Sequence, residues 1–213
     1  MTSVTSRGGS ADRYAHHVSA PESRSDVQRR LLSAATRLFA EHGFDRTSVS
    51  QIVEAAGVTK GAMYHYFRSK DDLLYEIYAR VLREQTRRLE ALAASGGPVA
   101  KRLHSIASDV VVSTIANLDD ATIFFQSLHQ LDPVMRKTVR AERRRYHERF
   151  RGLIEEGQRT GEFRADKPAE IIVDFFFGAV HHLAYWYRPS GELSAQQVGD
   201  HFADLLLDSL RPR

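Results

Sequence analysis

The chain of 213 residues contains no cysteine. Disulfides, a cysteine nucleophile, and zinc or iron–sulfur sites held by thiolates are therefore excluded. No apolar run approaches the roughly 18 residues that suggest a membrane-spanning helix, and the N-terminus has no apolar segment of the kind found in signal peptides. We therefore expect a cytoplasmic protein with no membrane partner.

Common enzyme motifs are missing as well. The sequence holds no G-x-S-x-G, no H-E-x-x-H and no glycine-rich phosphate loop. His181 and His182 are adjacent, and adjacent side chains on a helix diverge by about 100°, so this pair cannot hold a metal from one face. Glu155 and Glu156 have the same defect for acid–base work. We expect no enzyme activity, no cofactor and no metal.

The charge is unevenly distributed along the chain. Residues 25–70 carry seven Lys/Arg against four Asp/Glu, whereas residues 71–213 carry twenty against twenty-one. A small basic segment beside a near-neutral body suggests a polyanion that is bound at one end of the protein.

Apolar residues recur at helical spacing over most of the chain, and no convincing strand is present. The sequence therefore predicts an all-α fold of about nine helices. Residues 1–24 lack periodicity and are rich in Ser, Thr and Gly, so we expect a disordered tail, with a DNA-contacting arm as the alternative. The predicted helices span residues 25–42, 48–56, 60–66, 70–94, 98–117, 119–130, 133–160, 168–188 and 194–210.

Residues 45–70 carry the most specific signal. Two short helices are joined by a tight turn at Gly57, which suits a left-handed conformation. This pattern predicts a helix-turn-helix unit, whose second helix enters the major groove of DNA. Small residues are needed where the helix meets base edges, and Gly61 and Ala62 supply them. Donors for phosphate oxygens are supplied by Thr59, Lys60, Tyr64, His65, Tyr66 and Lys70.

The stretch from Ala34 to Leu74 resembles the TetR family of bacterial transcriptional regulators. The matching segments are A-A-x-x-L-F-A-E-x-G at 34–43, T-S-V-x-x-I at 47–52 and A-G-V-T-K-G-A-M-Y-H-Y-F-x-S-K-D-x-L at 56–73. The resemblance implies a DNA-binding domain at 25–74, with its fourth helix continuing to about residue 94. It also implies a ligand-binding and dimerisation domain at 95–213.

The resemblance further implies roles at matching positions. Ser48 and Ser50 would lie at the start of the second helix, against the DNA backbone and nearby base edges. Lys60 would contact guanine acceptors. The expected partner is a palindromic double-stranded operator bound by a homodimer. The alternative is an all-α ligand-binding protein or enzyme in which the helix-turn-helix is only structural.

The segment 168–188 is apolar on more than one face, so it needs more than its own domain core. In the family that this chain resembles, the last two helices form a dimer interface. We therefore expect an interface at 168–188 and 194–210, with a wholly intramolecular core as the alternative. The expected interface residues are Phe176, Ala179, Leu183, Val198, Phe202 and Leu205.

The remaining helices are expected to enclose a pocket for a small hydrophobic effector. Aromatic side chains mixed with polar tips suggest its lining. Between Arg136 and Arg151, eight basic residues face only two acidic ones. This stretch is either a solvated face or a site for an anionic ligand group. The candidate lining residues are Phe124, Phe125, Gln126, His129, Arg143, Tyr146, Phe150, Phe177, His181 and Tyr185.

Two further segments, W-Y-R-P-S-G-E-L-S-A-Q-Q-V-G at 186–199 and I-E-E-G-x-x-x-G-x-F at 154–163, resemble the actinobacterial branch of the family that represses steroid and fatty-acid catabolism. Several members of that branch bind acyl-coenzyme A thioesters. An acyl-coenzyme A is therefore one candidate effector, and an uncharged hydrophobic compound is the other.

Overall fold

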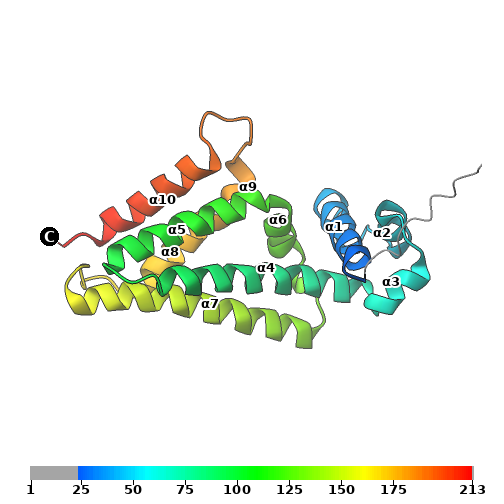
Figure 1. Ribbon diagram of the computed structural model, residues 1–213, viewed down its shortest axis with the longest axis horizontal. Coiled ribbons are helices and arrows are strands. Elements are labelled where there is room, and N and C mark those ends of the chain that lie inside the picture. The colour runs from blue at the N-terminus through cyan, green and yellow to red at the C-terminus, as the bar shows by residue number, and fades with distance from the viewer. Residues whose placement is uncertain (1–23, 213) are drawn as a thin grey trace, which may run out of the picture.

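The computed structural model describes residues 24–212, apart from the side chains at positions 24, 25, 121 and 124–126. The expected tail at 1–24 thus lies almost wholly outside the described residues. Over residues 24–212 every regular element is helical, which confirms the predicted all-α fold (Figure 1). The elements are α1 (Arg24–His42), α2 (Val49–Ala56), α3 (Lys60–Tyr66), α4 (Lys70–Ala93), α5 (Val99–Ala116), α6 (Leu118–Ser127), the 3-10 helix η1 (Leu128–Gln130), α7 (Pro133–Thr160), α8 (Ala169–His181), α9 (Leu183–Trp186) and α10 (Ala195–Leu210).

The headpiece is formed by α1, α2, α3 and the first turns of α4, at one end of the molecule (Figure 1). Its core contains Phe39, Ile52, Met63 and Leu74, which are almost completely buried. The same apolar cluster continues into the body through Ile123, together with residues of η1 and α7. The headpiece is therefore packed against the body, not merely tethered to it.

The body surrounds α5, which packs along α10 on one side and against α4 and α7 on the other. Its core includes Leu103, Phe150, Phe176 and Leu206. The long helix α4 runs from the headpiece through the length of the body (Figure 1). Along this helix, the Tyr78 hydroxyl donates a hydrogen bond of 2.9 Å to the carbonyl of Ile123 in α6. This one helix thus belongs to both halves of the molecule.

The predicted helix 168–188 is interrupted. The His182 N–H bonds the Ala179 carbonyl at 3.1 Å, and the Tyr185 N–H bonds the His182 carbonyl at 3.0 Å. These contacts span three residues instead of four, so the helix tightens there and divides into α8 and α9. In the part of the chain that is described, no helix is long and apolar enough to cross a membrane.

The end of α7 shows why one glycine is needed. Gly161 ends the helix in a left-handed conformation with φ of 79°, and the chain turns back so that the Phe163 N–H bonds the Gly157 carbonyl at 3.0 Å. A Cβ on Gly157 would lie 2.1 Å from the Phe163 ring. Position 157 must therefore be free of a side chain for this ring to pack.

Candidate functional site

The turn between α2 and α3 has the geometry expected from the sequence. Gly57 ends α2 in a left-handed conformation, with φ of 63° and ψ of 40°. The N–H of the next residue, Val58, bonds the Val53 carbonyl at 2.9 Å, so the turn closes on α2. Ile52 and Met63 are fully buried between the helices. These contacts fix the angle between α2 and α3.

Side-chain oxygens cap both helices. Ser48 and Gln51 form a reciprocal capping box at the start of α2. The Thr59 hydroxyl accepts a hydrogen bond of 3.1 Å from the Ala62 N–H at the start of α3. The residues proposed for DNA contact share one surface property, since each is exposed or half-buried on α2 or α3: Ser48, Ser50, Thr59, Lys60, Gly61, Ala62, Tyr64, His65 and Tyr66.

Gly61 is not required by the fold. Its φ lies in the ordinary helical range, and a Cβ would meet only the Thr59 hydroxyl oxygen, at 3.8 Å. That distance is an ordinary van der Waals contact. The exposed first turn of α3 thus presents bare backbone to the exterior, next to the Lys60 side chain.

Lys70 differs from the other predicted contacts. Its Nζ donates hydrogen bonds to the carbonyls of Phe44, at 2.7 Å, and Thr47, at 3.0 Å. The ammonium also lies 4.2 Å from the centre of the Phe44 ring. The sequence argument assigned this residue to phosphate contact. The structure instead uses the ammonium group to hold the α1–α2 loop against α4.

The body contains a pocket of about 220 Å³ between α4, α5, α6, α7 and α8. Its wall is part apolar, with Val81, Val110, Tyr146, Phe177 and Val180, and part polar. The polar lining comprises Arg80, Glu84, Gln85, Arg88, Ser113, Thr114, Asn117, Asp120, Arg143, His147 and His181.

Nitrogen-bearing side chains gather on the α7–α8 wall. Arg143 Nη2 lies 3.0 Å from His181 Nε2, and the His147 ring stacks on Phe177 with centroids 4.1 Å apart. Burial, followed by the Arg143 charge, lowers the pKa of His147 to about 4 and that of His181 to about 3. Both imidazoles are therefore neutral near pH 7, beside the guanidinium.

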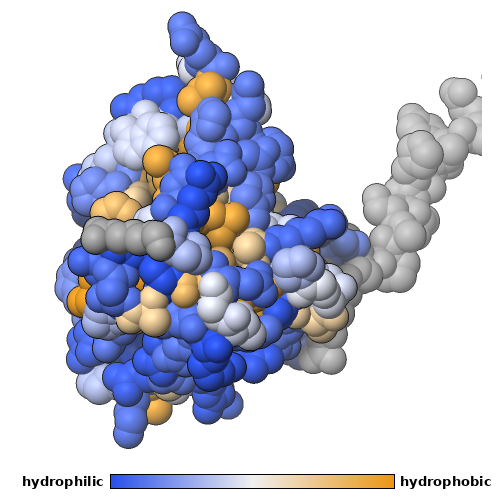
Figure 2. All heavy atoms as spheres, turned by 90° about the vertical axis from the view of Figure 1, so that its left-hand side faces the viewer, coloured by the Kyte–Doolittle hydropathy of each residue, from blue (hydrophilic) through white to orange (hydrophobic). Residues whose placement is uncertain are grey.

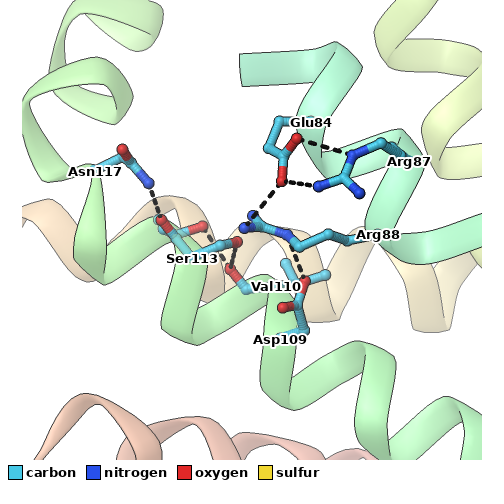
Figure 3. Close-up of polar contacts among 8 residues, drawn as sticks. Glu84, Arg87, Arg88, Asp109, Val110, Ser113 and Asn117 are labelled. Atoms are coloured by element: carbon cyan, nitrogen blue, oxygen red, sulfur yellow. Dashed lines mark hydrogen bonds and ion pairs between the residues drawn. The ribbon is translucent and has the colours of Figure 1, made fainter. Parts of the chain in front are cut away.

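The α4–α5 wall is held by an ionic chain (Figure 3). Arg88 Nε lies 3.2 Å from a carboxylate oxygen of Asp109, and its Nη1 lies 3.7 Å from a carboxylate oxygen of Glu84. Glu84 in turn accepts a hydrogen bond of 2.6 Å from Arg87. Nearer the headpiece, Arg80 of α4 lies 3.4 Å from Asp120 of α6. Charged pairs thus connect α4 to α5 and to α6.

The structure brings together only some of the predicted lining. Arg143, Tyr146, Phe177 and His181 line the pocket. Phe150 lies just behind it, stacked on Phe176 in the core at 5.1 Å. His129 in η1 and Tyr185 in α9 are exposed and do not line the pocket. The side chains of Phe124, Phe125 and Gln126 in α6 lie outside the described part of the structure.

Sequence reasoning missed the contribution of α4 and α5. Arg80, Glu84 and Arg88 face the pocket at successive four-residue steps along α4. Charged residues at this spacing resemble a solvated helix face, so the sequence alone offered no signal. His147 was also missed, although it lies one helical turn from Arg143 on the same basic stretch.

Most of that basic stretch points to solvent. Lys137, Arg140, Arg144, Arg145 and Arg149 are all exposed along α7. Of the eight basic residues, only Arg143 lines the pocket. The solvated-face alternative therefore describes most of this helix surface.

The predicted interface residues divide between two faces. Phe176, Leu183 and Val198 are almost fully buried within the subunit. This burial corrects the prediction for these three, because they are already covered without a second copy. Ala179 and Phe202 are half-buried and Leu205 is exposed. The exposed apolar side chains on this side are instead Ile171, Phe175, Tyr185, Trp186 and Leu205.

Comparisons with known proteins identify the two halves. Residues 31–77 match the family described as bacterial regulatory proteins of the tetR family. Residues 96–210 match the tetracyclin repressor-like C-terminal domain. The chain belongs to the TetR family. It is a helix-turn-helix transcriptional regulator, and the prediction that it is not an enzyme is confirmed.

The relatives of this TetR-family chain include steroid regulators. The HTH-type transcriptional repressor KstR2 of Rhodococcus jostii strain RHA1 is 28% identical over 188 residues, which cover 88% of this chain and 92% of that protein. The solved structure of the ketosteroid transcriptional regulator KstR2 of Mycobacterium tuberculosis has a TM-score of 0.79 at 24% identity, and covers 91% of this chain and 98% of that one. These findings agree with the resemblance to the actinobacterial steroid branch.

A second similar structure, that of AibR, was solved in complex with isovaleryl coenzyme A and operator DNA. It has a TM-score of 0.75 at 21% identity, and covers 85% of this chain and 98% of that one.

Within the described residues, no group of three His, Asp or Glu side chains could hold a metal ion.

Proposed function

We propose that this TetR-family chain is a cytoplasmic homodimeric repressor, which binds a palindromic operator and releases it when a small effector enters the pocket. The observation that carries the proposal is the continuity between headpiece and pocket. Tyr78 and Leu82 of α4 belong to the headpiece cluster and also line the pocket. A ligand in the pocket would therefore contact the helix that supports α3.

The DNA surface is supported by the exposed start of α3. Lys60 is exposed beside Gly61, and Tyr64 has 53% of its surface accessible. A lysine at the first position of a recognition helix suits guanine O6 and N7. Tyr64 and His65, one turn along, suit phosphate oxygens. An isologous dimer would repeat this surface about one turn of DNA away, which matches a palindromic operator.

The dimer is supported by the apolar face of α8. Phe175 is 73% exposed and Ile171 is 60% exposed. Gly178 follows on the same face, and a Cβ there would meet no other atom within 4 Å. Leu205 of α10 is 68% exposed. Large side chains flanking an open glycine suit close approach by a helix from a second copy.

The effector class is supported by the pocket's size and lining. The pocket volume of about 220 Å³ lies below the roughly 300–1,000 Å³ of typical pockets for drug-sized ligands. A small apolar group would fit between Val81, Tyr146 and Phe177. An acyl-coenzyme A could place only its acyl group there, and the acyl-coenzyme A bound to AibR makes this class worth testing.

The test combines DNA binding with ligand release. Fluorescence anisotropy on the region upstream of the protein's own gene should show salt-dependent binding. Lys60→Ala should weaken it by roughly 1–3 kcal/mol. Arg145→Ala on α7, which removes an exposed charge from the body, serves as the matched control. Equal binding by the parent and Lys60→Ala at matched salt would contradict the assignment of α3. An effector should lower operator affinity 5–150-fold, which corresponds to a coupling of about 1–3 kcal/mol.

A further inference from the structure

We propose that the effector of this pocket carries a carboxylate, which is bound by Arg143, His147 and His181 on the α7–α8 wall. This inference rests on the proposed effector-binding function and names the chemical class of the ligand. The first observation behind it is the placement of these three side chains. The three side chains line one pocket, and the successive helices α7 and α8 bring them together.

The geometry of the cluster is that of a donor site. Arg143 Nη2 approaches the His181 ring at 3.0 Å, and the His147 and His181 ring centres lie 6.4 Å apart. A guanidinium offers five N–H donors in a planar fork, and a neutral imidazole offers one. A carboxylate can accept about four hydrogen bonds. One guanidinium fork beside two imidazoles is therefore a set of donors that suits a carboxylate.

The electrostatics of the cluster favour an anion. Arg143 lowers the pKa of both histidines, after burial, which means that positive charge at this place is disfavoured by its own neighbours. His182 adds to this effect at His181. Asp174 acts in the opposite sense on His147 but is an exposed residue at the protein surface. A carboxylate in the pocket would offset the Arg143 charge, beside two imidazoles that stay neutral near pH 7.

The opposite wall is close to neutral and so favours one orientation of the ligand. Glu84 and Asp120 line the pocket from α4 and α6, and burial raises the pKa of Asp120. Arg80 and Arg88 line this wall as well, and they pair with carboxylates. The charges of this wall therefore offset one another, whereas the pocket lining on α7 and α8 includes Arg143 and no carboxylate. The carboxylate would thus face α7 and α8, with the apolar body of the ligand between the walls.

The inference makes the carboxylate, not merely the apolar body, responsible for affinity. The probes are hexanoate, octanoate and decanoate, their primary alcohols, and their coenzyme A thioesters, all titrated into the full-length protein by calorimetry near neutral pH. At least one acid should bind about ten- to a hundredfold more tightly than its alcohol, as expected for a charged hydrogen-bonded pair. Arg143→Gln should remove that preference, and Arg143→Lys should retain part of it. The exposed Arg144→Gln, one residue along α7, is the matched control.

Two results would overturn the inference. One is that no acid binds more tightly than its alcohol. The other is that a thioester binds best and is unaffected by Arg143→Gln. Thermal unfolding and operator binding of each variant, measured in parallel, show that it is folded. Operator binding is measured separately, so neither result contradicts the proposed repressor function. Failure of the parent protein to bind any operator would contradict that function instead.

Discussion

Gly61 offers a direct test of the DNA-binding surface, because a side chain at this position should stabilise the fold but weaken DNA binding. A methyl group at position 61 would lie 3.8 Å from the Thr59 hydroxyl oxygen and touch nothing else. Replacing glycine by alanine in a helix stabilises it by roughly 0.5–1 kcal/mol. Position 61 is in the first turn of α3, so we expect about 0.5 kcal/mol for Gly61→Ala. In a protein of this size that raises Tm by about 1–2 °C.

The same substitution should weaken binding to the operator. If the bare backbone at Gly61 lies against base edges or a phosphate, the added methyl group occupies the space of the DNA. Loss of one good contact would cost roughly 1–3 kcal/mol, or about five- to 150-fold in operator affinity. Anisotropy titrations of parent and variant at the same salt concentration measure this change, and thermal unfolding measures the stability.

The control is Gly152→Ala in α7, where a Cβ meets nothing within 4 Å. It should gain stability in the same way and leave operator affinity unchanged. Should Gly61→Ala be stable and bind the operator as tightly as the parent, the start of α3 cannot be closely apposed to DNA, and the reasoning is refuted.

Three other changes test the interface, the end of α7 and the buried histidines. Phe175→Asp should give a folded monomer by sedimentation velocity, since its side chain is 73% exposed; a stable dimer of this variant would exclude the α8 interface. Gly157→Ala should lower the free energy of unfolding by about 1–3 kcal/mol, because the new Cβ would displace the Phe163 ring, and urea unfolding at the parent's stability would contradict that packing. Acidification to about pH 5.5 should lower the free energy of unfolding by about 1 kcal/mol through His181. In the unfolded chain this histidine has a pKa near 6.5, whereas in the folded chain its pKa is about 3, so protonation favours the unfolded state. His181→Gln should remove that part of the dependence of stability on pH. An unchanged dependence would show that folding does not lower the pKa of His181.

The helices and the headpiece could be predicted because their signals are local. The Ser48–Gln51 capping box and the left-handed Gly57 are both present in the structure where the sequence indicated them. Each is decided by residues within one or two turns of the chain. The exposed start of α3 follows directly from these two boundaries. The fold class and the helix-turn-helix therefore needed no knowledge of long-range packing.

The pocket and the dimer face depend on packing between distant helices. Residues 168–188 are apolar on more than one face, so periodicity could not decide which face is covered within the subunit. The structure turns Phe176 into the core and leaves the adjacent Phe175 exposed. In the same way, nothing local indicates that Arg88 of α4 meets Asp109 of α5. Such choices depend on how helices pack, and helical periodicity does not determine them.

The charged wall of α4 also limits how strongly an effector could act. Arg80 and Arg88 are eight residues apart, or about 12 Å along the helix, and pair with Asp120 and Asp109. Partly exposed ion pairs contribute up to about 1 kcal/mol each. A ligand that displaced both pairs would thus change the balance between two positions of α4 by up to about 2 kcal/mol. That upper bound lies within the range of about 1–3 kcal/mol that is typical for coupling between two sites. Because the same helix begins in the headpiece core, where Leu74 is buried, rearrangement of these two pairs would contribute a coupling of that size to the proposed operator release.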